Sequence, residues 1–540
     1  MELYEGAEKE TVVHAFARAV AAFPDDLFLN IAGERFSYAE VDRAATRLAH
    51  ELAALGVVKG DRVVTLTETN VDVVPLWLAI NRIGAIWVPI NTAYRGDFLR
   101  HQIADAGACL AICDEDYLAR IVDIAADLPA LRLVLSRGAG PYPACAVPVE
   151  PLDAHRGTDE APIPIDVTPQ DLACLIYTSG TTGPSKGCMV SHAYLCNQGR
   201  QHRQALPQAR GEIGWTCLPM FHTAGITHVL AAMLDGHGAA LWPFFSVSQF
   251  WDHIEASGAS HALLMATIFG LVANAPDTPA MKRCHGQLKA IIGVPIPPDI
   301  KAIWEQRFGV GYCMPYAYGQ TEANRMSSLT FGDPEPLPGS AGRPTDAFVL
   351  AILDDSGNVL PEGEVGEIAV RPRRPGVMFD GYWNRPEETV KAWRNLWMHT
   401  GDLGRMEQGC LFFVDRKKDY LRCRGENVSS FEIERAFQAH PAIRESAVHA
   451  VGQQSGEDEI KITIVPKDDA DPDPRELCEW AIGQLPHFAV PRYFEFRAEL
   501  PKNPTGRVLK YQLRDEGVTT ATWDREAHGI TVRKQRRPAA

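Results

Sequence analysis

A glycine-rich segment between Tyr177 and Gly187 has the composition of an anion-binding loop. It reads Tyr-Thr-Ser-Gly-Thr-Thr-Gly-Pro-Ser-Lys-Gly and follows the apolar run 172–176, which predicts a loop leaving a strand. Its glycines let backbone amides turn toward an anion, its hydroxyls can donate to phosphate oxygens, and Lys186 adds a mobile positive charge. The GxxxxGK[ST] spacing of a P-loop is absent, and a flexible surface loop is the alternative interpretation.

Two further motifs carry groups that suit a nucleotide. Tyr-Gly-Gln-Thr-Glu at 318–322 offers a ring that can stack on a purine, a hydroxyl for phosphate and a carboxylate that can hold Mg²⁺. Its alternative is the start of a capped helix. His-Thr-Gly-Asp at 399–402 places a carboxylate after a glycine, where it can accept bonds from ribose hydroxyls or simply form an Asx turn.

Two charged segments follow. The first runs from Asp-Arg-Lys-Lys-Asp at 415–419 to Arg-Gly-Glu-Asn-Val at 424–428, and a solvated linker is its alternative interpretation. The second, 501–510, is bounded by proline and glycine and presents three cations, and its alternative is a surface turn.

The elements that would position these motifs alternate between helix and strand. Apolar residues at 41, 45, 48, 52 and 55 follow a helical period, with Ser37 and Glu40 as a capping box and Gly56 as the stop. The next segment, 62–66, has the pattern of a strand. This alternation continues to about residue 300 and predicts α/β architecture with parallel sheets covered by helices.

The predicted pattern of secondary structure changes twice toward the C-terminus. Beyond Gly332, short strands such as 348–353 and 366–370 are separated by Gly, Pro and Asp, which favours a small barrel-like β region. After Asp415 we expect a helix near 431–437, strands at 446–451 and 460–465, and a helix near 477–485. We therefore predict an N-terminal domain over 1–416 and a small, mobile α+β domain over 417–540, with a disordered tail near 530–540.

Composition excludes several classes of protein. The chain has 540 residues, 46% hydrophobic and 22% charged, which is ordinary for a globular protein. Its net charge of −15 argues against a nucleic-acid binder, whose footprint should be basic. Twelve scattered cysteines without a CxxC pair favour reduced thiols in the cytoplasm. The acidic N-terminus is unlike a signal peptide, and the most apolar stretch, 71–90, reads as a buried helix and strand rather than a membrane span.

Taken in this order, the five motifs resemble the adenylate-forming superfamily of acyl-CoA synthetases, peptide-synthetase adenylation domains and luciferases. The resemblance extends from the helix start at 37–38 to the loop at 505–507. It is supported by Leu-Pro-Met-Phe-His at 218–222, Gly-Val-Pro at 293–295, Gly-Tyr-Trp at 381–383 and Gly-Glu-Asn at 425–427. Within the superfamily the chain is similar to the carnitine/crotonobetaine-CoA-ligase-like branch.

The resemblance implies an enzyme that joins a carboxylic acid to ATP, releases pyrophosphate and passes the acyl group to coenzyme A. The resemblance implies that Thr321 contacts phosphate, that Glu322 binds Mg²⁺ and that the phosphates are cradled by Thr178, Ser179, Gly180, Thr181, Thr182, Gly183 and Lys186. It implies that Tyr318 stacks on adenine against Gly293, Val294 and Pro295, and that Asp402 and Arg416 hold the ribose. It also implies that Lys418 is the hinge, that Arg424 and Gly425 lie in the segment that lines the thiol tunnel, and that His222 lies near the acyl carboxylate. A satisfied core histidine is the alternative for His222.

Two positions depart from the family pattern. The usual adenylation lysine is replaced by Arg507, which keeps a permanent charge on a bulkier, planar head. We predict that Arg507 does the work of that lysine, with Lys510 or Lys502 as stand-ins. Arg424 replaces a glycine that many relatives have, and it either narrows the tunnel or meets a CoA phosphate.

The kind of acid is inferred from the residues of the expected acyl pocket, and the acyl acceptor from the length of chain after Lys510. The expected acyl pocket, built from the helix after His222, 265–271, 293–294 and 316–319, is mostly apolar or small, with His228 as the main polar exception. An uncharged acid of modest size fits such walls. CoA is the expected thiol, because only about thirty residues follow Lys510. The alternatives are an adenylation enzyme that serves a carrier protein, an enzyme that stops at the adenylate, and a nucleotide-binding homologue weakened by Arg507. A homodimer is compatible with the sequence.

Overall fold

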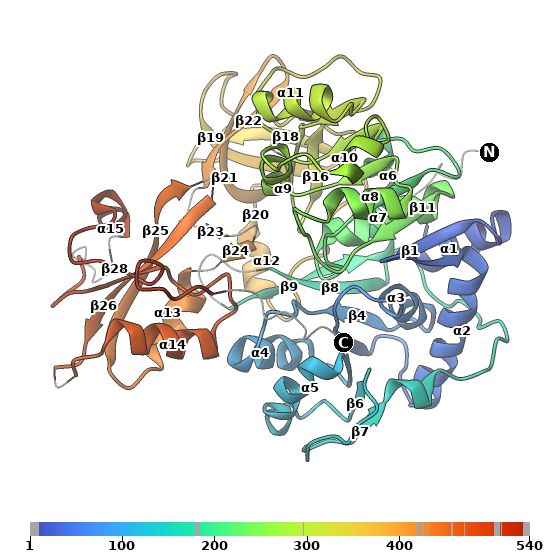
Figure 1. Ribbon diagram of the computed structural model, residues 1–540, viewed down its shortest axis with the longest axis horizontal. Coiled ribbons are helices and arrows are strands. Elements are labelled where there is room, and N and C mark those ends of the chain that lie inside the picture. The colour runs from blue at the N-terminus through green and yellow to red at the C-terminus, as the bar shows by residue number, and fades with distance from the viewer. Residues whose placement is uncertain are drawn as a thin grey trace. The chain divides into compact units, whose positions relative to one another are not determined.

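The computed structural model describes residues 10–178, 184–294, 296–416, 421–423, 426–428, 430–454, 457–468, 470–501, 508 and 510–532. Its contacts divide the chain into two compact units, drawn in Figure 1. The first comprises Met1–Thr92, Gln102–Tyr177 and Gly187–Asp415, and the second comprises Ala93–His101, Thr178–Lys186 and Arg416–Ala540.

The first unit contains a seven-stranded sheet that ends in the candidate phosphate loop. The strand order is β7-β6-β5-β3-β4-β8-β9, and the registered pairs from β7 to β8 are parallel. The strands are β3 (Arg62–Leu66), β4 (Ile86–Pro89), β5 (Leu110–Cys113), β6 (Leu133–Ser136), β7 (Val149–Pro151), β8 (Leu172–Thr178) and β9 (Lys186–Ser191). The connecting helices are α3 (Val73–Arg82), α4 (Gly96–Ala106) and α5 (Glu115–Val122), with short 3₁₀ turns at Ala125–Asp127 and Leu152–His155.

A second seven-stranded sheet has the order β14-β13-β12-β10-β11-β1-β2, with only the β1–β2 pair antiparallel among its registered pairs. Its strands are β1 (Leu27–Ile31), β2 (Glu34–Ser37), β10 (Ile213–Thr216), β11 (Gly238–Leu241), β12 (His261–Leu263), β13 (Ala290–Ile292) and β14 (Tyr312–Met314). The helices that precede or connect these strands are α1 (Val12–Ala22), α2 (Tyr38–Ala54), α6 (His192–Ala205), α7 (Thr223–Asp235), α8 (Phe250–Ser257), α9 (Ala266–Ala273), α10 (Pro279–Arg283) and α11 (Pro298–Arg307). Helices α6 and α7 lie side by side (Figure 1).

Local sequence signals set the bounds of several elements. The Ser37 Oγ accepts from the Glu40 amide at 3.2 Å, and a Glu40 carboxylate oxygen accepts from the Ser37 amide at 2.8 Å, so the predicted capping box starts α2. Gly56 follows the helix with φ +76°, a conformation that a glycine adopts without strain. The predicted strand 62–66 is β3, and the apolar stretch 71–90 forms the buried α3 and β4, as predicted.

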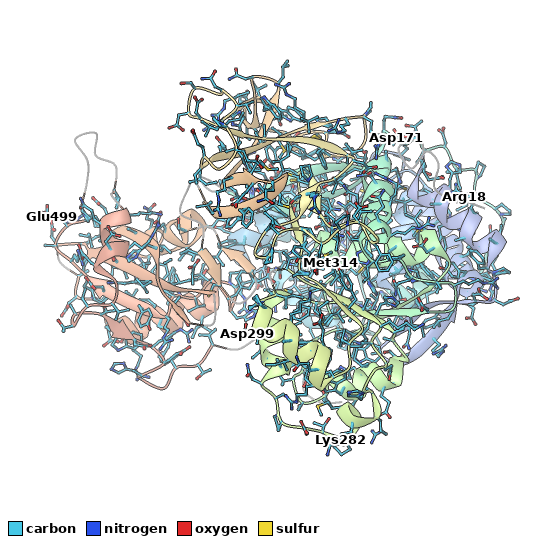
Figure 2. All side chains as sticks on the ribbon, turned by 90° about the horizontal axis from the view of Figure 1, so that it is seen from above. Arg18, Asp171, Lys282, Asp299, Met314 and Glu499 are labelled. Atoms are coloured by element: carbon cyan, nitrogen blue, oxygen red, sulfur yellow. The ribbon has the colours of Figure 1, made fainter. Side chains whose placement is uncertain are left out.

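The interior of the first unit is filled by large apolar side chains. Trp77 on α3 and Trp87 on β4 are both wholly buried and stack with ring centroids 5.5 Å apart. Met314 at the end of β14 is also wholly buried, whereas the exposed Lys282 lies at the periphery, as Figure 2 shows. Burial of such side chains is the main driving force that holds the sheets and helices together.

Two smaller antiparallel sheets complete this unit. One has the order β15-β16-β17, from β15 (Ala317–Gln320), β16 (Asn324–Ser328) and β17 (Arg343–Pro344). The other joins β18 (Phe348–Leu353), β19 (Gly366–Pro372), β21 (Trp397–Glu407) and β20 (Trp393–Arg394), with β22 (Cys410–Arg416) paired to β21; α12 (Pro386–Ala392) precedes β20. The predicted strands 348–353 and 366–370 are β18 and the greater part of β19.

The second unit has α+β architecture. A four-stranded sheet has the order β25-β26-β27-β28, and β23 pairs with β24. The elements are β23 (Leu421–Cys423), β24 (Glu426–Val428), α13 (Ser430–Gln438), β25 (Ile443–Gln454), β26 (Glu457–Pro466), α14 (Pro474–Gln484), β27 (Tyr493–Phe496), α15 (Lys510–Glu516) and β28 (Trp523–Asp524). Together, the two units confirm the predicted α/β fold class, with a large sheet-and-helix body and a smaller C-terminal one.

Two further predictions concern the state of the cysteines and the possibility of a membrane-spanning helix. All twelve cysteines fall among the described residues, and none of them forms a disulfide. Within the described ranges, none of the helices has both the length and the apolar character needed to cross a bilayer.

A buried ion pair lies at the centre of the second unit. The Lys461 ammonium on β26 donates to the Glu495 carboxylate on β27 at 2.7 Å, and both side chains are at most 3% exposed. Thr519 and Thr522 donate to the same carboxylate oxygen, each at 2.7 Å. Burial alone would raise the pKa of Glu495, but these hydrogen bonds outweigh it and hold the pKa at about 2.

We predict that Lys461→Met destabilises the second unit by about 1–3 kcal/mol, because the buried Glu495 carboxylate loses its ammonium and keeps only the Arg497 guanidinium, 2.6 Å away, as a charged partner. Urea unfolding measures this loss, and Lys467→Met, at an exposed position just beyond the end of β26, is the matched control. A folded-state pKa below the unfolded value of about 4.3 means that the wild-type stabilisation is present at neutral pH and is lost as the pH falls from about 4 toward 2. Equal stability of Lys461→Met and Lys467→Met would contradict this account.

Candidate active site

The Tyr-Gly-Gln-Thr-Glu motif occupies a strand and the turn after it. Residues 317–320 form β15, which pairs antiparallel with β16, and the register shifts between Tyr318 and Gly319. An ideal Cβ at Gly319 would lie 1.5 Å from the Asn324 carbonyl oxygen, so this position has no room for any side chain. The alternative interpretation of the motif as a helix start is therefore wrong, because cross-strand pairing with β16 determines its conformation.

Two predicted nucleotide-binding residues, 84 residues apart in sequence, meet in the structure. The Tyr318 hydroxyl donates to the Asp402 carboxylate at 2.7 Å. Gln320 donates to the same carboxylate oxygen at 2.8 Å and to the Thr400 carbonyl at 2.9 Å. Asp402 is 7% exposed, so a side-chain network positions a carboxylate whose direct contact with water is small.

The strand that carries Asp402 is fixed by a second carboxylate. Glu367 is buried, accepts from the Gly401 amide at 3.2 Å and lies 3.1 Å from the His399 ring nitrogen. The Thr400 hydroxyl donates to the Ile368 carbonyl at 2.7 Å, and its oxygen accepts from the Asp402 amide at 3.1 Å. The motif at 399–402 is thus part of β21, and its side chains fasten it to β19.

Glu322, the predicted Mg²⁺ ligand, is held in place by the 379–382 segment. One carboxylate oxygen accepts from the Tyr382 hydroxyl at 2.8 Å, and the Glu322 carbonyl accepts from the Phe379 amide at 2.9 Å. The preceding residue, Thr321, is anchored through its carbonyl by the Tyr194 hydroxyl at 2.8 Å. Among the described residues, no group of three or more His, Cys, Asp and Glu is arranged to hold a metal ion.

The segment that contains Tyr382 is also joined to the strand leaving the candidate phosphate loop. The Trp383 amide donates to the Gly187 carbonyl at 2.8 Å, and the Met189 amide donates to the Gly381 carbonyl at 2.9 Å. On the entering side, the Tyr177 hydroxyl donates to the Asp105 carboxylate at 2.8 Å. The strands on both sides of the loop are therefore anchored to the first unit.

The Gly-Val-Pro motif follows β13, as predicted. The Gly293 amide donates to the Met314 carbonyl at 3.3 Å. A Cβ at Gly293 would lie 2.1 Å from the Phe269 ring, so the glycine permits close packing of α9 against this strand end. Val294 is half-buried beside it.

His222 lies at the N-cap of α7 and is exposed. Its ring contacts that of Phe221, with centroids 4.9 Å apart. The alternative interpretation of His222 as a core histidine is wrong. His228, further along the same helix, is the buried residue, and its Nε2 donates to the Gly214 carbonyl at 3.0 Å.

The second unit holds the C-terminal end of the candidate phosphate loop. The Ser185 amide donates to the Glu432 carboxylate at 2.8 Å, and the His101 Nε2 contacts the Ser185 carbonyl at 2.9 Å. Lys186 begins β9 with a half-buried side chain, and Thr178 ends β8. The Lys510 ammonium on α15 forms an ion pair with Glu434 at 2.6 Å and donates to the Ser430 hydroxyl oxygen at 2.7 Å.

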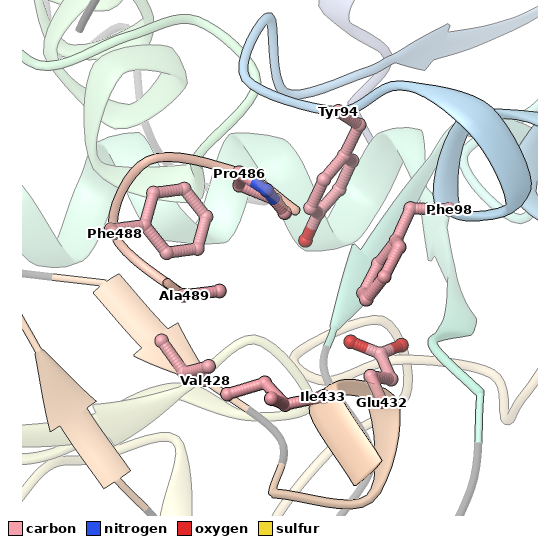
Figure 3. Close-up of a pocket in the computed structure, with 8 residues that line it drawn as sticks. All are labelled: Tyr94, Phe98, Val428, Glu432, Ile433, Pro486, Phe488 and Ala489. Carbon is pink, nitrogen blue, oxygen red and sulfur yellow. The ribbon is translucent and has the colours of Figure 1, made fainter. Parts of the chain in front are cut away.

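An apolar pocket in the same unit is shown in Figure 3. Tyr94 and Phe98 stack along one side of it, with ring centroids 5.8 Å apart. The remaining lining residues are Val428, Glu432, Ile433, Pro486, Phe488 and Ala489.

Several predicted site residues lie outside the described part of the chain. These are Ser179, Gly180, Thr181, Thr182, Gly183, Pro295, Lys418, Arg424, Gly425, Lys502 and Arg507. The backbone of Arg416 ends β22, and its side chain is outside the description.

Two buried polar atoms, on β16 and α6, could not be predicted from the sequence. Arg325 on β16 has an Nη1 that is buried without a hydrogen-bond partner, and His202 on α6 has an Nδ1 in the same condition. The sequence feature that could have indicated the buried nitrogen of Arg325 is a single arginine followed in its strand by Met, Ser and Ser. Arg325 as a whole is half-buried, and the sequence alone gives no reason to expect one of its nitrogens to be enclosed.

The geometry can be compared with known proteins. The sequence model of the AMP-binding enzyme family matches residues 16–383, and that of the AMP-binding enzyme C-terminal domain matches residues 432–507. The first match covers more than half of the chain, so the chain belongs to the AMP-binding enzyme family. The predicted membership of the adenylate-forming superfamily is confirmed.

Three relatives illustrate the likeness. Feruloyl-CoA synthase of Amycolatopsis sp is 30% identical, over 89% of this chain and 94% of that protein. Crotonobetaine/carnitine–CoA ligase of Salmonella arizonae is 29% identical, over 90% of this chain and 95% of that protein. The crystal structure of ATP-bound MatB from Rhodopseudomonas palustris is 30% identical with a TM-score of 0.67, over 93% of this chain and 98% of that one. The two named ligases confirm the predicted enzyme class, the acid–thiol ligases, and their near-equal identity favours neither acid.

We predict that Gly319→Ala destabilises the first unit by about 1–3 kcal/mol, because a Cβ there collides with the Asn324 carbonyl. Thermal unfolding measures the change. Gly270→Ala is the matched control: it lies in α9 with no atom within 4 Å of the added methyl group, so it should stabilise by up to about 1 kcal/mol. Equal melting temperatures for wild type and Gly319→Ala would contradict the tight packing described here.

Proposed function

We propose that this protein is an ATP-dependent acyl-CoA ligase. In the first half-reaction a carboxylate oxygen of the acid attacks the α-phosphorus of ATP, forming acyl-AMP and releasing pyrophosphate. In the second, the CoA thiol attacks the acyl carbonyl, forming the thioester and releasing AMP. The observation that carries this proposal is the convergence of Tyr318 and Gln320 on the Asp402 carboxylate, within a chain of the AMP-binding family.

The adenosine end of ATP is assigned to this cluster. The Asp402 carboxylate accepts hydrogen bonds from the Tyr318 hydroxyl and the Gln320 side-chain amide. When ATP binds, the ribose hydroxyls would take the place of these donors. Tyr318 lies across from the Phe413 ring, with centroids 6.1 Å apart, and offers an aromatic face for adenine. Gly293, Val294 and Pro295 would form the opposite wall, and Arg416 would contact the ribose from the end of β22.

The phosphate end is assigned to the 178–187 loop and Thr321. A displacement at phosphorus needs positioning and charge neutralisation more than covalent help from the protein. The backbone amides and hydroxyls between Thr178 and Gly183, with Lys186, supply donors to the phosphate oxygens. Both flanking strands are anchored, so only the loop itself has to adjust to the nucleotide.

Glu322 fits the single protein carboxylate of a Mg²⁺ site. Mg²⁺ in nucleotide enzymes is commonly held by one or two carboxylates together with phosphate oxygens and water. Glu322 presents oxygen ligands with one of them oriented by Tyr382. When bound, the ion would neutralise phosphate charge, and the task of this chain is to hold the carboxylate still.

His222 and the second unit complete the proposal. We propose that His222 meets the acid's carboxylate, and its exposure at the start of α7 supports this role. We propose that the domain that begins at 417 turns about Lys418 between the two half-reactions, with Arg424 and Gly425 beside the CoA thiol. The free thiols are consistent with an enzyme of the cytoplasm.

The proposed reaction is tested with the purified full-length protein, ATP, Mg²⁺ and a broad panel of carboxylic acids. We expect pyrophosphate release that depends on an acid, and AMP and acyl-CoA formation that depend on both an acid and CoA. Formation of the thioester only on a phosphopantetheinyl carrier protein would instead support the carrier-loading alternative. ATP binding without turnover on any acid would contradict the proposal and support the nucleotide-binding homologue.

We predict that Arg507→Ala lowers acid-dependent ATP–pyrophosphate exchange by about 10²–10³-fold, because it removes a fixed positive charge from the reacting carboxylate and phosphate. Arg507→Lys should retain most of the exchange, since it keeps the charge. Thioester formation from preformed acyl-AMP should persist in both variants, which separates a role in adenylation from misfolding.

Lys502→Ala is the matched control in the same loop and should exchange at close to the wild-type rate. Lys510→Ala should mainly reduce stability, because Lys510 pairs with Glu434. Undiminished exchange by Arg507→Ala would remove Arg507 from the mechanism.

A further inference from the structure

The backbone of Ser185, at the end of the candidate phosphate loop, is held by two side chains of the second unit. Its amide donates to a carboxylate oxygen of Glu432 on α13 at 2.8 Å, and its carbonyl accepts from the His101 Nε2 on α4 at 2.9 Å. Ser185 is 3% exposed, so water has little access to these two hydrogen bonds. The position of the residue just before Lys186 is therefore set by Glu432 and His101.

The pocket in Figure 3 joins the two segments that carry these side chains. Tyr94 and Phe98 stack on one side of it, and α13 contributes Glu432 and Ile433 to the lining. Both aromatic rings pack against the buried apolar cluster of this unit, which includes Ile433. His101 follows Phe98 by three residues on α4, so the burial that holds Phe98 also holds His101 near α13.

The Glu432 carboxylate makes the kind of contact that a phosphate would make. Both groups are anionic oxygen acceptors, and either forms a charge-assisted hydrogen bond with a backbone amide. Lys186 is the only charged side chain in the 178–187 sequence, so the composition of the loop suits an incoming anion. In the structure, the anion that one amide of this loop receives belongs to the chain itself.

Glu432 and the triphosphate of ATP would repel each other at this loop. A triphosphate carries several negative charges, and like charges a few ångströms apart interact strongly where burial limits screening by water. Ser185 follows Gly183, the last of the proposed loop donors, by two residues. A residue that served only to shape the loop could do so with a neutral acceptor such as glutamine, without placing a negative charge there.

We infer that Glu432 competes with the β- and γ-phosphates of ATP for the 178–187 loop, so that ATP binding breaks the hydrogen bond between Glu432 and Ser185. This inference rests on the proposed ligase function and adds a positioning residue to it, since Glu432 acts on the loop and not on the reacting atoms. Residue 432 is the first residue matched by the model of the C-terminal domain. ATP binding thereby releases α13 from the loop, and the departure of pyrophosphate lets it return.

The test compares ligand binding by the wild type and by Glu432→Gln, which removes the charge and keeps the size of the side chain. Isothermal titration calorimetry of the full-length protein with Mg²⁺ gives Kd for ATP, pyrophosphate and AMP. We expect Glu432→Gln to bind ATP and pyrophosphate about 10-fold more tightly than the wild type, because the competing anion is gone. AMP lacks the β- and γ-phosphates, so its Kd should be unchanged.

Steady-state kinetics gives a second readout. In Glu432→Gln the KM for ATP in acid-dependent pyrophosphate release should fall while kcat does not rise, and added pyrophosphate should inhibit at a lower concentration. A merely structural role would lower the melting temperature and leave the ratio of ATP to AMP affinity unchanged. Glu479→Gln, the same change at an exposed position on α14, is the matched control and should bind all three ligands as the wild type does.

The outcomes separate this inference from the proposed function. If the wild type binds no nucleotide and no acid elicits pyrophosphate release, the ligase function itself fails. If ATP is bound and turned over, but Glu432→Gln binds it with the wild-type Kd or more weakly, the ligase function stands and the competition is overturned. The competition is also overturned if AMP binding tightens as much as ATP binding, since the effect then lies away from the β- and γ-phosphates.

Discussion

A short stretch of backbone pairing between β9 and residues 380–383 determines where the candidate site forms. Trp383 and Met189 each donate an amide hydrogen across it, and this pairing places Tyr382 where its hydroxyl reaches Glu322. Three motifs separated by up to two hundred residues are thereby brought together. Backbone hydrogen bonds suit this task, because they do not depend on which side chains the two segments carry.

From this anchor the site is built on strands rather than on free loops. Tyr318 and Gln320 lie on β15, Asp402 lies on β21, and the buried Glu367 fixes the backbone at Gly401. Groups held by strands and by supporting hydrogen bonds keep their geometry before a ligand arrives, so little reorganisation is needed when charge develops. The strands on either side of the candidate phosphate loop, β8 and β9, are likewise fastened, through the hydrogen bonds of Tyr177 and of Gly187 and Met189.

Much of the fold could be predicted because its signals are local. The capping box of α2, the strand 62–66 and the Gly-Val-Pro strand end depend on neighbours in sequence, and the structure has them as predicted. The site could be predicted only as far as its motifs. That Tyr318 donates to Asp402, that residues 318–320 form a strand rather than a helix start, and that His222 is exposed all depend on pairing between distant segments.

The absence of space at Gly319 also limits which residues this position can hold. A larger residue there would have to displace the Asn324 carbonyl, because that oxygen already occupies the volume that a side chain would need. Glycine at this point is therefore a requirement of the strand pair that carries Tyr318, whichever acid the enzyme takes.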